Sequence, residues 1–161
     1  MTTELEPADR AREIIEANRY MTLGTVEPDG RARVSPVYYA PDGHSVLYWI
    51  SSPAAQHSRN VAERPDVSIV VFDSQAPIGQ AQAVYMTGHA ALVPESDLDD
   101  CAEVACRARF PEQQPFPLDE LRGPAPFRLY CADVTEHEIH VRGSDPVHGT
   151  GIDRRMGVTL S

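Results

Sequence analysis

The sequence predicts a mainly β (α+β) domain, in which six to seven antiparallel strands form a small split barrel with about three short helices. Short runs rich in β-formers follow one another along the chain, and turn signals at Pro28-Asp29-Gly30 and Pro41-Asp42-Gly43 separate the first three. Strands and helices do not alternate, which argues against a parallel doubly wound sheet. A closed or split barrel leaves few strand edges exposed. With 161 residues, 42% of them hydrophobic, the chain is long enough to form a core.

The first part of the chain predicts a helix, three strands and a second helix. Residues 9–18 place apolar side chains at helical spacing. Strands follow over residues 20–26, 31–40 and 45–50, and core packing is expected for Tyr48 and Trp49 in the third. Ser52 suits an N-cap and Pro53 the first helical position, so a short helix is expected to continue to Arg64.

The second part predicts three more strand regions and one helix. Residues 67–72 form a nearly continuous apolar run, and residues 80–93 predict a long strand with a bulge at Gly88. A helix is expected from residues 94–97 to about 110, and five prolines predict a loop over 111–126. The last strand or strand pair covers 127–134 and 136–142, and a polar, loose tail is expected from Gly143. The expected divisions are a helical region over 1–19, the barrel over 20–142 and the tail over 143–161.

Composition and charge narrow the classes of partner. A net charge of −10 with scattered Arg and Lys disfavours nucleic acid, and no run reaches the ~20 apolar residues that cross a bilayer. The N-terminus lacks the basic start and apolar run of a secretion signal, so a cytoplasmic protein is expected. Cys101, Cys106 and Cys131 form no C-x-x-C pair and are expected as reduced thiols. His137 and His140 would face opposite sides of a strand, so no metal site is predicted.

The segment from Ser51 to Asn60 predicts an anion site. It joins a strand to a helix through two serines, and the first turn of a helix offers unpaired N–H groups and the positive end of the helix dipole. His57 and Arg59 add donors or positive charge about one turn further on. This pattern indicates a phosphate site for a phosphorylated cofactor. The alternative is that Ser-Ser-Pro only caps a helix whose polar side chains meet solvent.

Four motifs, in their order and spacing, resemble the pyridoxamine 5′-phosphate oxidase-like family of FMN-binding split-barrel proteins. The resemblance covers about residues 20–93 and extends more weakly to about 141. The motifs are Met21-Thr22-Leu23-Gly24-Thr25-Val26-Glu27-Pro28-Asp29-Gly30, Arg33-Val34-Ser35-Pro36-Val37-Tyr38-Tyr39, Tyr48-Trp49-Ile50-Ser51-Ser52 followed by Gln56-His57-Ser58-Arg59-Asn60-Val61, and Arg64-Pro65-Asp66-Val67-Ser68.

The resemblance implies a homodimer that holds two FMN molecules in clefts between the subunits. The strand over residues 33–37 would line the isoalloxazine edge, the serines would contact the ring or the ribityl phosphate end, and Gln80 and Gln82 would reach the flavin from the other subunit. The alternative for these glutamines is an exposed, merely polar strand. The expected cofactor-binding residues are Arg33, Val34, Ser35, Pro36, Val37, Ile50, Ser51, Ser52, Gln56, His57, Arg59 and Gln82.

The sequence departs from the family pattern at two places. Gln56 and His57 fall where the family commonly carries an Arg-Lys pair for the phosphate, and each lost charge-assisted contact weakens binding by ~1.5–3 kcal/mol. A protonated His57, or Arg59, would supply part of the missing charge. Residues 141–161 do not resemble the Trp- and Arg-rich end of pyridoxamine phosphate oxidases, so a vitamin B6 substrate is not predicted.

The function predicted is that of an FMN-dependent oxidoreductase acting on an unidentified small molecule. In such enzymes the cofactor carries the chemistry, and no residue is assigned a catalytic role. Two alternatives remain: a deazaflavin-dependent reductase, and a flavin- or haem-binding module without turnover. A serine hydrolase is disfavoured because no G-x-S-x-G motif is present.

Overall fold

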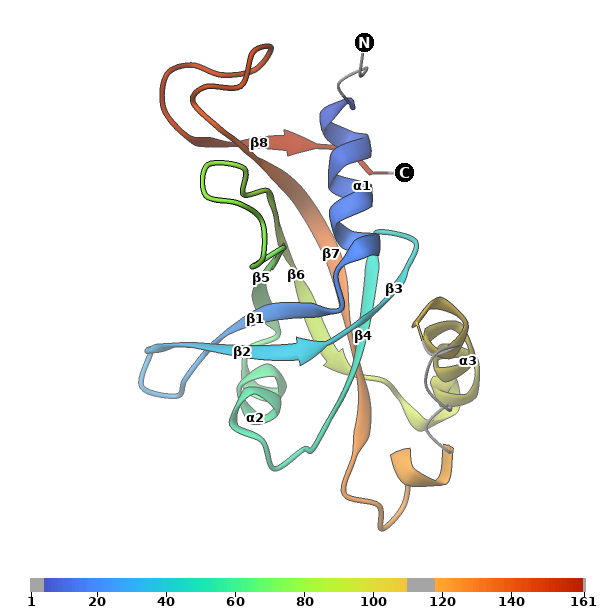
Figure 1. Ribbon diagram of the computed structural model, residues 1–161. Helices are drawn as coiled ribbons and strands as arrows, with labels where there is room; N and C mark the ends of the chain where they lie inside the picture. Colours follow the sequence, from blue (N-terminus) through green and yellow to red (C-terminus); the bar gives the residue numbers. More distant parts are fainter. Residues whose placement is uncertain (1–4, 110–117, 161) are drawn as a thin grey trace.

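The computed structural model describes residues 5–109 and 118–160, and Figure 1 shows its elements along the chain. The helices are α1 (Pro7–Ala17), α2 (Gln56–Glu63) and α3 (Leu98–Arg109), with 3₁₀ turns η1 (Glu95–Asp97) and η2 (Leu118–Leu121). The strands are β1 (Tyr20–Val26), β2 (Ala32–Tyr38), β3 (Ala40–Asp42), β4 (Val46–Ser51), β5 (Asp66–Phe72), β6 (Ala83–Leu92), β7 (Arg128–Val141) and β8 (Arg154–Val158).

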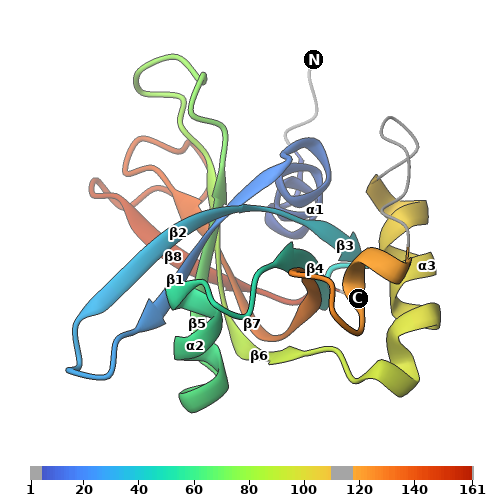
Figure 2. The same cartoon turned by 90° about the horizontal axis from the view of Figure 1, so that it is seen from below.

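The strands form one antiparallel sheet in the order β2-β1-β5-β6-β7-β4-β3, with β8 added beside β7. β7 is a single strand of 14 residues that pairs with β6, β4 and β8, so it joins the two halves of the sheet. The sheet curls round its inner face (Figures 1 and 2), which confirms the predicted split barrel. The described residues form eight strands because the second predicted strand divides at Tyr39 and because the tail supplies β8.

Two hydrophobic clusters lie on the two sides of β4. Leu47 and Trp49 face the main core inside the barrel, where Trp49 stacks on Tyr130 with ring centroids 5.8 Å apart. Tyr48 faces a second cluster against α3, as alternation along a strand requires. The predicted burial of Tyr48 and Trp49 is therefore confirmed. α1 closes the main core with three buried side chains, which are Ala11, Ile14 and Ile15.

The second helix begins later than predicted, at Gln56. Ser52 Oγ accepts a hydrogen bond from the Ala54 N–H at 3.2 Å, and the Ala55 N–H donates to the Ser52 carbonyl at 3.0 Å. Ser52 is therefore the first residue of a turn and not an N-cap, because a serine followed by proline also stabilises a local turn. This correction brings Gln56 and His57 into the first turn of α2.

The long strand β6 begins at Ala83, so Gln80 and Gln82 lie exposed in the preceding loop and not on the strand. The predicted bulge is confirmed, because the register between β6 and β7 shifts between Thr87 and Gly88. A Cβ at Gly88 would lie 2.3 Å from the Asp133 carbonyl oxygen, so only glycine allows this approach.

The expectation of a loose tail is wrong for residues 154–158. They form β8, which pairs with β7 from His137 to Val141. The connecting loop is tied down by Asp145, which accepts the N–H groups of Val147 at 3.0 Å and His148 at 2.8 Å. Arg10 of α1 forms an ion pair with Asp145 at 3.4 Å, so the loop is also linked to the first helix.

Candidate functional site

A hydroxyl group at the end of β4 lies at the centre of the predicted anion site. Ser51 is buried, and its Oγ lies 2.8 Å from Nε2 of His57. Ser58, which follows His57 in the first turn of α2, donates a hydrogen bond to Ser51 Oγ at 3.3 Å. Because Ser51 accepts from Ser58, its own proton is available for the imidazole. A neutral His57 that accepts from Ser51 at Nε2 carries its ring proton on Nδ1.

The environment of His57 favours this neutral form. Burial lowers the pKa of His57 below its ordinary value, and the positive charge of Arg33 on β2 lowers it further. Arg33 lies on β2, a strand that contacts α2. The predicted positive charge at His57 is therefore conditional on an anion that compensates for this environment.

Gln56 is used inside the helix. Its Nε2 donates to Asn60 Oδ1 at 2.8 Å, and its Oε1 accepts from the Arg59 guanidinium at 2.5 Å. Asn60 is almost completely buried and donates to Thr25 Oγ1 of β1 at 3.0 Å. This chain of side-chain bonds fixes the rotation of α2 against the sheet and so sets the position of His57.

Three arginines lie on or beside α2: Arg33 on β2, Arg59 in the first turn of the helix and Arg64 at its C-terminal end, and each has a partner. Arg33 pairs with the carboxylate of Glu27, and Arg64 donates to the Glu27 carbonyl at 2.5 Å. Arg59 donates to the Ala54 carbonyl besides contacting Gln56. No side chain caps α2, whose N-cap residue is an alanine. The N–H groups of its first turn therefore remain suited to an anion.

The predicted site residues divide between this cluster and other places. Arg33, Ser51, Gln56, His57 and Arg59 gather at the junction of β2, β4 and α2, and Ser52 lies beside them in the preceding turn. The other predicted residues lie elsewhere. Val34 and Pro36 are exposed on the outer face of the sheet, Ser35 is half-buried, Val37 packs in the main core, Ile50 packs towards α3, and Gln82 is exposed in the loop before β6.

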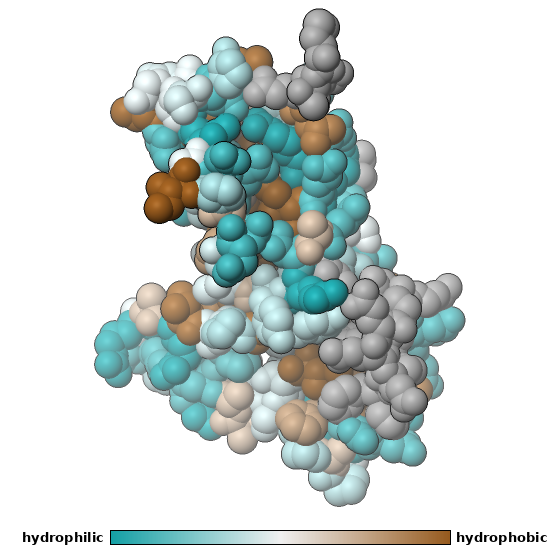
Figure 3. Space-filling model, in the orientation of Figure 1, coloured by the Kyte–Doolittle hydropathy of each residue, from teal (hydrophilic) through white to brown (hydrophobic). Residues whose placement is uncertain are grey.

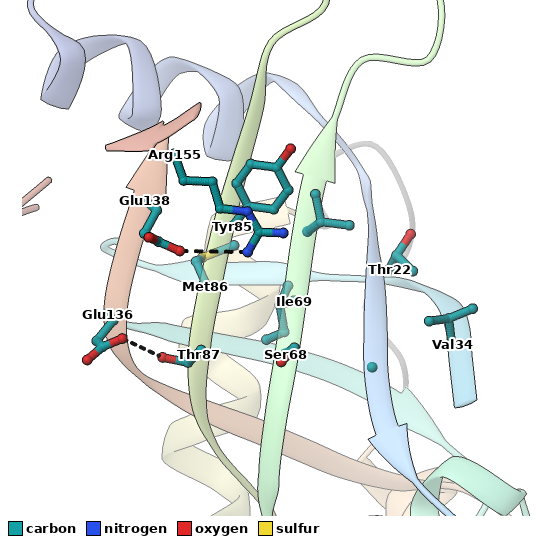
Figure 4. A pocket seen from close by; sticks show the side chains of 12 residues that line it. Thr22, Val34, Ser68, Ile69, Tyr85, Met86, Thr87, Glu136, Glu138 and Arg155 are labelled. Carbon is teal, nitrogen blue, oxygen red and sulfur yellow. Dashed lines mark hydrogen bonds and ion pairs between the residues drawn. The ribbon is translucent and has the colours of Figure 1, made fainter. Parts of the chain in front are cut away.

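A shallow pocket of about 210 Å³ lies on the outer face of the sheet, next to Val34 of β2 (Figure 4). Its far wall carries charge: the Arg155 guanidinium lies 3.7 Å from the centre of the Tyr85 ring and 3.7 Å from a carboxylate oxygen of Glu138. Thr22 and Gly24 of β1 form its floor with residues of β5 and β6. On the side of the molecule seen in Figure 3, apolar residues are scattered among hydrophilic ones and the outline is indented.

Sequence reasoning missed several of these residues. Asn60 stands four positions after Gln56 and so lies on the same side of the helix. Thr25 lies on the same face of its strand as the buried Met21 and Leu23. Both patterns indicate a buried polar contact. The pocket residue Arg155 could not be predicted from the sequence, because residues 154–158 carry no strong strand signal.

His137 and His140 of β7 have separate partners. His137 Nε2 donates to the His44 carbonyl at 2.7 Å, and His140 Nε2 lies 3.4 Å from a carboxylate oxygen of Asp153. Among the side chains that the structure describes, no three from His, Cys, Asp or Glu gather as metal ligands would. In the described part of the chain, the helices are too short or too polar to span a bilayer.

Solved structures share this fold. A candidate 5-nitroimidazole antibiotic resistance protein from Bacteroides thetaiotaomicron superimposes with a TM-score of 0.70 at 14% identity, with 84% of each chain covered. The haem storage protein HutZ from Vibrio cholerae gives a TM-score of 0.63 at 20% identity, covering 86% of this chain and 96% of HutZ. An F420 reductase gives 0.57 at 25% identity, covering 78% of this chain and 94% of the reductase.

No curated protein is significantly similar to the chain in sequence. The family model described as pyridoxamine 5′-phosphate oxidase, in contrast, matches residues 7–140, which include α1, the strands β1 to β6 and nearly all of β7. The match and the split barrel agree, and the chain belongs to the pyridoxamine 5′-phosphate oxidase family.

Proposed function

We propose that the protein binds FMN with its phosphate against the first turn of α2 and acts as an FMN-dependent oxidoreductase on a small molecule. The observation that carries the proposal is the 2.8 Å contact of Ser51 with His57 in the first turn of α2, a helix that contacts β2, the strand of Arg33. Hydroxyl, imidazole, guanidinium and uncapped backbone N–H groups together form a donor set that suits a phosphate monoester. When bound, the flavin would supply the electron transfer.

The chain's own residues would bind and orient the cofactor. Ser51, Ser52 and the first-turn N–H groups of α2 would hold the phosphate, and Arg33 would add charge from β2. The neighbouring exposed residues of β2, Val34 and Pro36, would lie along the edge of the ring. Strand β2 is fixed to β1 over seven paired positions, so it offers a rigid support for an extended ring system.

A second copy of the chain would complete the cleft. The pocket beside Val34 has about 210 Å³, below the roughly 300–1,000 Å³ of pockets that enclose a ligand. The outer face of the sheet exposes 69% of Val34 and 61% of Tyr20. The same face carries Glu138 and Arg155, which have opposite charges. In a dimer with a twofold axis, Glu138 of one copy would therefore be able to pair with Arg155 of the other. We therefore propose a homodimer with the cofactor at the interface.

Titration with cofactors tests the proposal and its alternatives. FMN added to the apoprotein should shift the flavin absorption and quench its fluorescence at a saturable site, and Ser51→Ala should weaken binding about tenfold or more. Ser74→Ala, in an exposed loop, is the matched control and should leave FMN affinity unchanged. The similarity to an F420 reductase makes a deazaflavin the second candidate. If a deazaflavin binds more tightly than FMN, the deazaflavin becomes the assigned cofactor.

Turnover separates the enzyme from a binding module. Reduced nicotinamide and small-molecule electron acceptors, added to the holoprotein, should give steady flavin reduction and reoxidation. Binding of FMN without any turnover, or preferential binding of haem, would contradict the oxidoreductase assignment. Failure of every flavin to bind would contradict the proposed function as a whole.

A further inference from the structure

We propose that His57 takes up one proton when the phosphate of the cofactor binds, so that the protein binds FMN more tightly at lower pH. The inference rests on the proposed function and adds a regulation of the same site. It follows from the way Ser58, Ser51 and His57 are connected, and from the absence of permanent cations at positions 56 and 57.

In the neutral form of His57 that carries its proton on Nδ1, the hydrogen bonds around Ser51 all run in one direction before binding. Ser58 donates to Ser51, and Ser51 then donates to Nε2 of His57. The ring is thus an acceptor at Nε2 and presents only its Nδ1–H as a donor. Gln56 does not compensate, because both ends of its amide are occupied by Asn60 and Arg59.

The arginines near the His57 ring only partly replace the permanent cations that positions 56 and 57 lack. On β2, Arg33 is partly neutralised by Glu27, which follows β1. On α2 and at its end, Arg59 and Arg64 are held by carbonyl groups. The other side chains that are hydrogen-bonded within this cluster are uncharged: Thr25 on β1, Ser51 on β4, and Ser58 and Asn60 on α2. His89 on β6 is exposed and pairs with Asp66 of β5.

A phosphate dianion beside the ring reverses the balance that keeps it neutral. An opposite charge within a few ångströms favours the protonated imidazole and opposes the burial that lowers the pKa of His57. A proton from solvent then occupies Nε2, which becomes a donor to Ser51 Oγ. Ser51 has two lone pairs, so it can accept from both Ser58 and His57 and turn its own O–H towards the phosphate. No bond other than N–H is formed, and no electron is transferred.

The pH dependence follows from linkage. Uptake of one full proton strengthens binding tenfold for each unit that the pH falls. This pH dependence ends near pH ~6, because a phosphate monoester takes up a proton there and loses its second negative charge. We therefore expect the dissociation constant of FMN to fall by up to about a hundredfold between pH 8.5 and 6.5.

Calorimetry in two buffers of different ionisation enthalpy measures the proton uptake directly. At pH 7.5, FMN should bind with an uptake approaching one proton, and riboflavin, which lacks the phosphate, with none. His57→Gln keeps a neutral donor and should abolish the uptake. His57→Lys supplies a permanent cation and should give tight binding that changes little with pH. His148→Gln, a histidine far along the chain in the loop before β8, is the control and should behave as the wild type.

The outcomes separate this inference from the proposed function. FMN binding with no proton uptake and a flat pH profile overturns the role of His57 and leaves flavin binding intact. Uptake that persists in His57→Gln places the proton elsewhere and also overturns it. Absence of FMN binding overturns both. The wild-type imidazole resonances provide a check that needs no variant of uncertain folding, since one histidine should titrate at clearly higher pH with FMN than without.

Discussion

At the scale of single residues, Gln56 in the first turn of α2 makes its side-chain hydrogen bonds within the helix. Gln56 stands where the family resemblance leads us to expect a cation for phosphate, but here its amide joins Arg59 to Asn60. The next residue, His57, keeps an exposed side to its ring while Ser51 occupies Nε2. In the proposed site, a titratable group would therefore take the place of a permanent charge, and affinity for an anion would depend on protonation.

Two half-buried histidines, His57 and His137, should make the fold sensitive to acid. Burial lowers the pKa of both His57 and His137 in the folded protein, whereas unfolding returns each to about 6.5. Below about pH 6.5 the unfolded chain therefore binds more protons than the folded one, and stability falls as the pH falls towards the folded pKa values. Urea denaturation at pH 7.5 and 5.5 should show this loss, and His137→Gln should reduce it. An equal loss in wild type and variant would contradict the prediction.

At the scale of elements, the irregularities of the sheet decide where its side chains point. The bulge at Gly88 adds a residue to the pairing of β6 with β7, so Thr87 and Glu136 remain beside the outer pocket while the rest of β6 shifts register. The break at Tyr39 similarly lets β2 pair with β1 and β3 pair with β4.

Gly88→Ala should test the bulge. The new Cβ would lie 2.3 Å from the Asp133 carbonyl oxygen, so the two strands must move apart, at a cost of about 1–3 kcal/mol. Gly157→Ala on β8 is the matched control, since a Cβ there meets no atom within 4 Å. Thermal unfolding should show a clear drop in Tm for Gly88→Ala and little change for Gly157→Ala. Similar Tm values for the two variants would mean that the close approach is not needed.

At the scale of the whole molecule, the outer face of the sheet is the surface that the helices leave uncovered near the site. Residues from β2 on one side to β8 on the other line its pocket, and the charged pair of Glu138 and Arg155 lies at the far end (Figure 4). A cleft made from one such face is open, and a second copy would supply the missing wall.

Val34→Arg should separate the subunits and weaken FMN binding together. A charge placed on each copy of an apolar, 69% exposed residue would meet its symmetry mate at or near the interface. Light scattering should report a dimer for the wild type and a monomer for Val34→Arg. Val147→Arg changes a residue of equal type and 67% exposure in the loop before β8, and should remain dimeric. A dimeric Val34→Arg with wild-type FMN affinity would contradict the proposed interface.

Local sequence signals determined much of this protein. Strand alternation, turn signals such as Pro28-Asp29-Gly30, and the bulge at Gly88 depend on neighbouring residues, and the structure confirms them. Motif order also identified the segment around Ser51 and His57, which the fold brings within hydrogen-bonding distance of each other.

Only the tertiary structure decided the rest, because it depends on partners distant in the sequence. Residues 154–158 become a strand because β7 offers them an edge, and Ser52 starts a turn because the chain must leave β4 before α2 packs on β1. The same holds for Gln56, whose inward bonds exist only once Asn60 is fixed by Thr25. Propensity acts over a few residues, whereas burial and hydrogen bonding between strands are settled by the fold as a whole.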